Sequence, residues 1–146
     1  MEDRIIGGGS VIRDHRGRCL VGCYSRENDN NAFKAEALAS PDVLQLAWDR
    51  GFRKVICDVD CIDLVKVITD AEAVHRHSEY LVLSSICQLL AKQWDVKLNS
   101  FHRDSNVVAD YLARRGANEI FPGFWIFDSL DPDIEYLLLK NLMSIL

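Results

Sequence analysis

The chain has 146 residues and a formal net charge of −5. This length is sufficient for one domain with a substantial core. The acidic balance argues against a non-specific nucleic-acid binder, which is usually basic, so any phosphate contact must come from a local patch or a bound metal. No apolar run reaches the ~20 residues of a membrane-spanning helix, so we expect no membrane contact.

The cysteines predict a reducing compartment. There are five, at Cys19, Cys23, Cys57, Cys61 and Cys87. Their number is odd and no signal peptide precedes them, so we expect reduced thiols in an intracellular protein, with nucleus and cytoplasm both open. The first three are expected to fill core space. The spacing of cysteines and histidines matches no usual zinc motif.

A β-hairpin is predicted near the start of the chain. Residues 10–13 and 18–26 suit strands, and Asp14 and Gly17 suit the tight turn between them. Three glycines precede the hairpin, at 7–9. They do not form a phosphate-binding loop, because the Lys and the Ser or Thr of that motif are absent and no helix follows.

A long helix is predicted over residues 32–51, with apolar positions at helical spacing and Gly51 at its end. Pro41 interrupts the pattern, since proline inside a helix costs about 3 kcal/mol and removes a hydrogen bond. Ser40-Pro41-Asp42 is also a good helix start. We therefore expect a kink or a restart near residue 40, and not a loop.

The next segment, Lys54 to Cys61, predicts a buried strand over residues 53–60. Side chains alternate along a strand, so Asp58 and Asp60 are expected on one face together with Ile56. Two acids there are costly unless they reach water, bind a cation or find donors. From this segment alone, a solvated strand end and a functional site both remain open.

The remaining patterns alternate between helix and strand. The pattern over residues 122–132 is less regular, and no element is assigned there. The last segment, 133–146, predicts an apolar helix that must pack on the domain, on a protein partner or on a second copy. The order predicts an α/β domain with a mixed sheet over residues 1–117 and a C-terminal extension over 118–146. The intervening elements are expected to be a helix at 61–70, a polar connection at 71–77, a helix at 79–93, a strand at 94–103 and a helix at 107–115 closed by Gly116.

Four segments, in this order, resemble a type 1 ribonuclease H domain. The resemblance is greatest to the plant retroelement-derived, reverse-transcriptase-associated branch, and it covers roughly residues 7–116. The tail after Phe127 is similar to the tail of that branch. The four segments are Gly-Gly-Gly-Ser-Val-Ile-Arg-Asp-His-Arg-Gly, Ala-Glu-Ala-Leu-Ala, Gly-Phe-Arg-Lys-Val-Ile-Cys-Asp-Val-Asp-Cys and His-Arg-Asp-Ser-Asn-Val-Val-Ala-Asp-Tyr-Leu-Ala.

The resemblance implies a five-stranded sheet flanked by helices and hydrolysis of the RNA strand of RNA–DNA hybrids by two Mg²⁺ ions. Carboxylates suit that chemistry, because two hard cations about 4 Å apart need oxygen ligands and negative charge. Glu36, Asp60 and Asp110 match three metal-binding acids of the family. Arg103 and Asn106 match its polar pair before the last helix, near the substrate phosphate. The family's catalytic histidine has no clear match.

The resemblance also implies that a strand is missing. The family pattern begins with a strand that ends in Asp-Gly, well before the hairpin, and that Asp is the ligand shared by both metals. Only six residues precede Gly7, and Asp3 is too close to the hairpin to match. We therefore expect a sheet without its N-terminal strand. The hairpin then pairs directly with the strand at 53–60, a gap opens, or another chain supplies a strand.

Three functional hypotheses follow. One is an endoribonuclease that cleaves RNA–DNA hybrids with Mg²⁺ and is impaired by the loss of the shared Asp. Another is a catalytically degenerate domain that binds nucleic acid or a protein partner. The third is a truncated gene product without a settled function. The sequence alone does not separate the last two.

Overall fold

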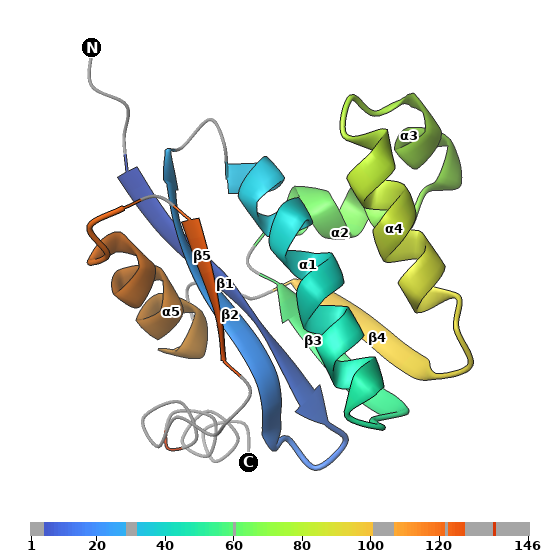
Figure 1. Ribbon diagram of the computed structural model, residues 1–146, viewed down its shortest axis with the longest axis horizontal. Coiled ribbons are helices and arrows are strands. Elements are labelled where there is room, and N and C mark those ends of the chain that lie inside the picture. The colour runs from blue at the N-terminus through green and yellow to red at the C-terminus, as the bar shows by residue number, and fades with distance from the viewer. Residues whose placement is uncertain are drawn as a thin grey trace.

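The computed structural model describes residues 5–28, 32–59, 61–100, 107–121, 123–127 and 136. For residues 5–8, 27, 28, 32, 107–110 and 113 the structure describes the backbone and not the side chain. Helices and strands alternate along most of the chain (Figure 1). In chain order the elements are β1 (Ile5–Asp14), β2 (Cys19–Asn28), α1 (Ala32–Asp49), β3 (Lys54–Val59), α2 (Ile62–Ile68), α3 (Ala71–Arg76), α4 (Tyr80–Leu90), β4 (Asp95–Ser100), α5 (Val107–Ala117) and β5 (Gly123–Phe127).

The strands form one five-stranded mixed sheet in the order β4-β3-β1-β2-β5. Only the β3–β4 pair is parallel among these strands, and α2, α3 and α4 form the crossover between them. The predicted fold class, a mixed sheet flanked by helices, is confirmed. The expected number of strands was wrong. The sheet is not one strand short of five, because β5 adds a strand where the sequence pattern assigns no element.

The hairpin lies in the middle of the sheet. β1 pairs with β2 on one side and directly with β3 on the other, antiparallel in both cases. The register places Val11 opposite Asp58 and Ser10 opposite Val59. Direct pairing of the hairpin with β3 is one of the three arrangements that we expected.

The hairpin turn forms as the sequence predicts. Asp14 Oδ1 accepts hydrogen bonds from the backbone N–H groups of Arg16 and Arg18, both at 2.9 Å. Gly17 has a φ of 86°, a conformation that glycine adopts without a steric penalty. The turn is therefore fixed by local chemistry and brings β1 and β2 into register.

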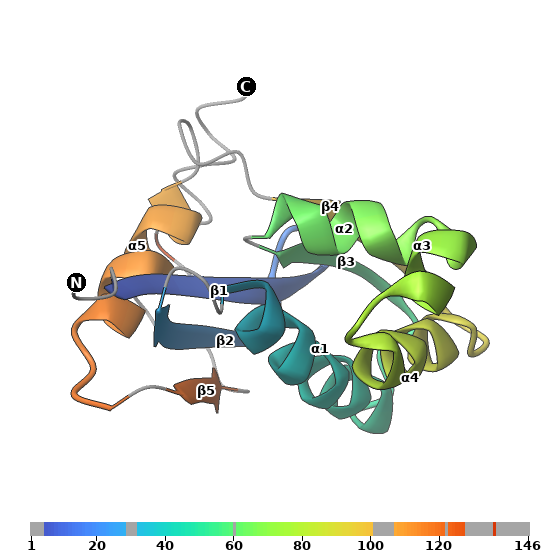
Figure 2. The same cartoon turned by 90° about the horizontal axis from the view of Figure 1, so that it is seen from above.

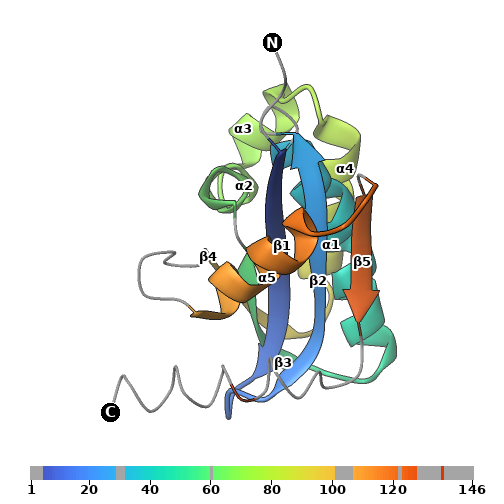
Figure 3. The ribbon, with the colours of Figure 1, turned by 90° about the vertical axis from the view of Figure 1, so that its left-hand side faces the viewer.

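Helices cover both faces of the sheet. Figure 3 shows α5 crossing in front of β1 and β2, with α1 behind them. Figure 2, seen from above, places α1 and α4 on one side of the sheet and α5 on the other. The sheet is thus the middle layer of three, and the two outer layers differ in size because, in the described part of the chain, a single helix covers the second face.

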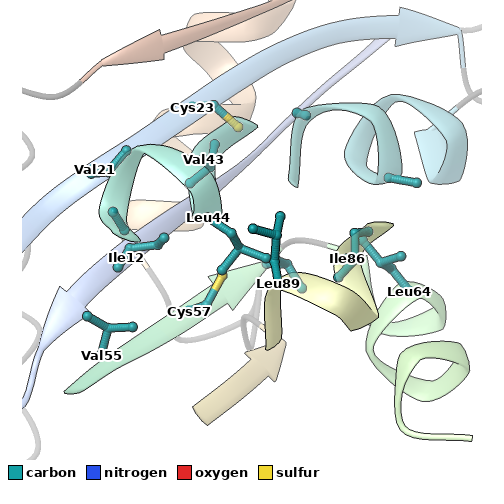
Figure 4. Close-up of a cluster of buried hydrophobic side chains, with 14 of the residues drawn as sticks. Ile12, Val21, Cys23, Val43, Leu44, Val55, Cys57, Leu64, Ile86 and Leu89 are labelled. Atoms are coloured by element: carbon teal, nitrogen blue, oxygen red, sulfur yellow. The ribbon is translucent and has the colours of Figure 1, made fainter. Parts of the chain in front are cut away.

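Each face has its own apolar core. The face under α1 buries a large cluster that includes Ile12, Val21, Leu44 and Cys57 (Figure 4). The face under α5 buries a small cluster of Val11, Cys19, Tyr24 and Leu112. Neighbouring residues of β1 point to opposite faces, as strand geometry requires, so Ile12 enters one core and Val11 the other.

Two glycines allow close packing on the α5 face. A Cβ at Gly9 would lie 2.6 Å from the backbone oxygen of Cys23 and 2.9 Å from Cβ of Leu112. A Cβ at Gly22 would lie 2.4 Å from the ring of Phe127. Gly9 therefore lets α5 approach the hairpin, and Gly22 makes room for the end of β5.

Two helices differ from the prediction. The expected polar connection at 71–77 contains the helix α3, which begins after Asp70, whose carboxylate accepts hydrogen bonds from the backbone N–H groups of Glu72 and Ala73. The long helix does not restart near residue 40, because α1 runs from Ala32 to Asp49 with Pro41 inside it. The Ser40 hydroxyl donates to the Glu36 carbonyl oxygen at 2.7 Å in the same turn.

The C-terminal segment stays largely a prediction. The expected apolar helix at 133–146 lies outside the described residues except for Tyr136, which is exposed. Within the predicted extension at 118–146, β5 pairs with β2 and belongs to the sheet. None of the helices in the described part of the chain combines the length and apolar character needed to cross a membrane.

Candidate functional site

Glu36 is a buried acid on α1, with 4% of its surface exposed. Its neighbours Ala35, Ala37 and Ala39 are also buried, so the first half of α1 is enclosed on most sides by the protein. These small side chains let the helix lie close to the sheet. The carboxyl group of Glu36 is therefore held inside the structure.

Three cysteines lie close enough to the Glu36 carboxyl group for its charge to affect their pKa values. Burial is the main cause that raises the pKa of the Cys23, Cys57 and Cys61 thiols, and in each case the nearby charge of Glu36 raises it further. Cys57 lies on β3, and Cys61 follows Asp60 directly. Glu36 thus lies within electrostatic range of the C-terminal end of β3, where the sequence places Asp60.

The two buried thiols near Glu36 are neutral. The Cys23 thiol has a pKa raised to about 12, and its Sγ lies 3.1 Å from Oγ of Ser10. The pKa of Cys57 is also raised, by burial first and then by the charges of Asp58, Cys23 and Glu36. Both side chains belong to the buried apolar cluster under α1, so these thiols fill core space as predicted.

Asp58 lies on the opposite face of the sheet and is engaged by Arg13. Arg13 Nε donates to Asp58 Oδ2 at 2.5 Å, and Asp58 is 7% exposed. Arg13 lies two residues along β1 from Val11, the partner of Asp58, so both side chains share one face. The Asp58 carboxylate therefore forms an ion pair with Arg13 and is already engaged.

Of the predicted site residues, the structure describes one side chain fully. Glu36 is placed as above. Asp110 lies on α5, but its side chain is not described. Asp60, Arg103 and Asn106 lie outside the described residues. The described part of the chain contains no group of three His, Cys, Asp or Glu side chains arranged to hold a metal. The meeting of Glu36, Asp60 and Asp110 therefore stays a prediction.

The Arg13–Asp58 ion pair is a feature that the sequence did not predict. The two residues are separated by 45 positions, and their contact depends on β1 lying next to β3. Alternation along each strand shows which neighbours share a face with Arg13 on β1 and which share a face with Asp58 on β3. Only the pairing of the two strands shows that these faces coincide.

Comparison with known proteins identifies a family for most of the chain. A family model described as reverse transcriptase-like matches residues 1–116. That match covers the hairpin, α1, β3, the crossover helices, β4 and nearly all of α5. No curated protein and no solved structure matches the chain.

Proposed function

This chain belongs to the reverse transcriptase-like family, and from that premise we propose that it slowly hydrolyses the RNA strand of RNA–DNA hybrids. The proposed site consists of Glu36, Asp60 and Asp110 and holds Mg²⁺. Arg103 and Asn106 are proposed to contact the substrate phosphate. The fold and the family support a ribonuclease H-like domain, and the reaction itself is the proposal.

The observation that carries this proposal is the buried carboxyl group of Glu36, whose charge acts on Cys61, the residue that follows Asp60. An acid that is 4% exposed in a helix that packs on a sheet is uncommon, because burying a charge is costly. A cation shared by Glu36 and Asp60 would be held by both carboxylates.

The helices α1 and α5 cover opposite faces of the sheet (Figure 3). Glu36 on α1 and Asp110 on α5 can therefore act together only beyond the end of the central strands, where Asp60 follows β3. All three side chains offer carboxylate oxygens, which Mg²⁺ prefers as ligands. When bound, Mg²⁺ lowers the pKa of a water molecule and stabilises the developing charge on the phosphate oxygens. The carboxylates orient the metal and supply the negative charge that retains it.

Slow cleavage follows from the strand next to β3. At the end of β3 its neighbour is β1, which presents Ser10 and Val11 opposite Val59 and Asp58. Neither is an acid. We propose that the family's first strand, with the Asp shared by both metals, is missing here, so that the bridging charge is lost and metal affinity falls.

The test is cleavage of an RNA–DNA hybrid labelled on the RNA strand, with Mg²⁺. Wild-type protein should release short RNA products slowly, and Asp60→Asn should abolish the release. Asp63→Asn is the matched control, because Asp63 is exposed on α2 three residues later and should retain wild-type activity. Equal loss in both variants, or intact RNA with folded wild-type protein, would contradict the proposal.

A second candidate function is hybrid binding without hydrolysis. The contact between Arg13 and Asp58 favours it, because this contact engages the carboxylate that β3 could otherwise have lent to the metal site. Titration of a fluorescent hybrid with Ca²⁺ in place of Mg²⁺ measures binding without turnover. Saturable binding together with intact RNA in Mg²⁺ would select this candidate over cleavage.

A further inference from the structure

The strand β5 leaves an apolar edge at one side of the sheet. It pairs with β2 through Gly123–Phe127, and among the described residues no strand pairs with its other edge. An unpaired edge presents a row of backbone N–H and C=O groups that can pair with another strand. Natural proteins usually protect such an edge with charged side chains, proline or a covering segment.

The two edges of this sheet differ in how well their side chains protect them against pairing with another strand. The β4 edge carries Asp95 and Lys97, both exposed. By contrast, the sequence from Ile120 to Phe127 contains no charged residue, and its one proline, Pro122, comes before β5 and not within it. Pairing of β5 with the β4 edge of another copy would place uncharged aromatic residues against charges. The edge chemistry therefore disfavours open end-to-end stacking of sheets and favours contact between two β5 edges.

Exposed apolar side chains extend this surface. Ile120 is 80% exposed, Phe121 72% and Ile126 37%. They precede or belong to β5, so they are continuous with its free edge along the chain. The rest of the molecule is acidic overall, with a net charge of −5, so most other contacts between two copies would oppose like charges. The segment 120–127 avoids that repulsion.

We propose that β5 is a self-association edge, at which two copies of this chain pair antiparallel about a two-fold axis through Trp125. A two-fold contact uses the same surface on both copies and closes on itself. In this register Gly123 lies opposite Phe127 of the partner, so the smallest residue of the strand faces a bulky one. Phe124 lies opposite Ile126 of the partner, which covers a half-exposed isoleucine.

The interface is small, so the dimer is weak. Ile120, Phe121 and Ile126 together expose about 400 Å² of apolar surface per copy, taking roughly 200 Å² for one large side chain, and of the three only Ile126 lies within the paired strand. A standard stable interface buries ~800 Å² per partner. The dimer therefore forms at high protein concentration and dissociates on dilution. This proposal is independent of the proposed hydrolysis, since β5 lies at the sheet edge beside β2 and not at the end of β3.

Sedimentation equilibrium over a concentration series tests the proposal. Wild-type protein should shift from monomer to dimer as concentration rises, and Ile126→Lys should raise the dimer dissociation constant at least tenfold. Leu81→Lys is the matched control, because Leu81 is 80% exposed on α4 and its loss removes a similar apolar side chain elsewhere. It should leave the dimer unchanged. Circular dichroism establishes that both variants are folded.

Amide hydrogen exchange separates a second copy from other occupants of the edge. Backbone amides of β5 that do not pair with β2 should become protected only at concentrations where the dimer forms. Protection of these amides in the dilute monomer would mean that another segment of the same chain covers the edge, which overturns the proposal. A wild-type protein that stays monomeric throughout, or equal weakening by Leu81→Lys, would also overturn it.

Discussion

Buried thiols at the centre of the sheet link the stability of the fold to pH. Burial and then the charge of Glu36 raise the pKa of Cys23 from 9.0 to about 12, and burial is also the main cause that raises the pKa of Cys57. A group whose pKa is higher in the folded state binds more protons there. Its contribution to stability is complete below the unfolded pKa and is lost as the pH rises towards the folded value.

We therefore expect the free energy of unfolding to fall above about pH 9, by about 1.4 kcal/mol per pH unit for each buried thiol. Urea denaturation between pH 8 and 10.5 measures this slope. Cys57→Ala should flatten it by one thiol's contribution, whereas Ser85→Ala on the exposed side of α4 should leave it unchanged. The same slope in wild type and Cys57→Ala would contradict the argument.

A second prediction concerns the contribution of the Arg13–Asp58 ion pair to the free energy of unfolding. Its side chains are 22% and 11% exposed, whereas those of the Arg76–Glu72 pair are 78% and 82% exposed. Loss of one partner leaves the other charge poorly solvated in the buried pair. Asp58→Asn should lower the free energy of unfolding by about 1–3 kcal/mol, and the control Glu72→Gln by less than about 0.5 kcal/mol. Similar losses in both variants would refute the distinction.

The packing of α5 against the hairpin depends on the absence of a side chain at Gly9. The atoms nearest to a new Cβ are a backbone oxygen of β2 and the buried side chain of Leu112. The oxygen belongs to the sheet and cannot move freely, so α5 must shift. Gly9→Ala should lower the free energy of unfolding by about 1–3 kcal/mol, the usual cost of overpacking. The change is measured by urea denaturation.

Ala117→Ser serves as the contrast for Gly9→Ala, because Ala117 is exposed at the end of α5. It tests whether adding an atom near α5 is damaging in general. A loss at Gly9 together with little change at Ala117 places the cause at the contact between α5 and the hairpin. Unchanged stability of Gly9→Ala would contradict the close approach.

Elements with local signals were predictable from the sequence. The hairpin follows from Asp14 and Gly17, which act within their own turn. The helix α3 was missed because it has only six residues, and its main signal is the capping Asp70. The strand β5 was missed because Phe124 to Phe127 is a continuous apolar run without alternation, and its pairing with β2 is distant in sequence.

The candidate site was predictable only in part, for a similar reason. The resemblance selects Glu36, and the structure shows that it is buried. Nothing in the periodicity of α1 distinguishes an acid that faces the sheet from one at the edge of the helix. The contact of Arg13 with Asp58 was not predictable, because it requires the pairing of β1 with β3.

The whole molecule is organised by the two faces of its sheet. The larger core under α1 carries Glu36, and α5, which carries Asp110, covers the smaller one. A site that uses both acids must lie beyond the ends of the strands, where neither face is covered by the other's helix. The proposed site therefore depends on the whole sheet being folded. Folding and activity should be lost together on heating.

Separate labelling of the two strands of one RNA–DNA hybrid tests the proposed function most directly. With excess protein and Mg²⁺, we predict slow release of fragments from the RNA strand alone, no fragments after removal of Mg²⁺ by EDTA, and no release by Glu36→Gln. Folded wild-type protein that leaves both strands intact, or that cuts the RNA as fast in Glu36→Gln, would contradict the account.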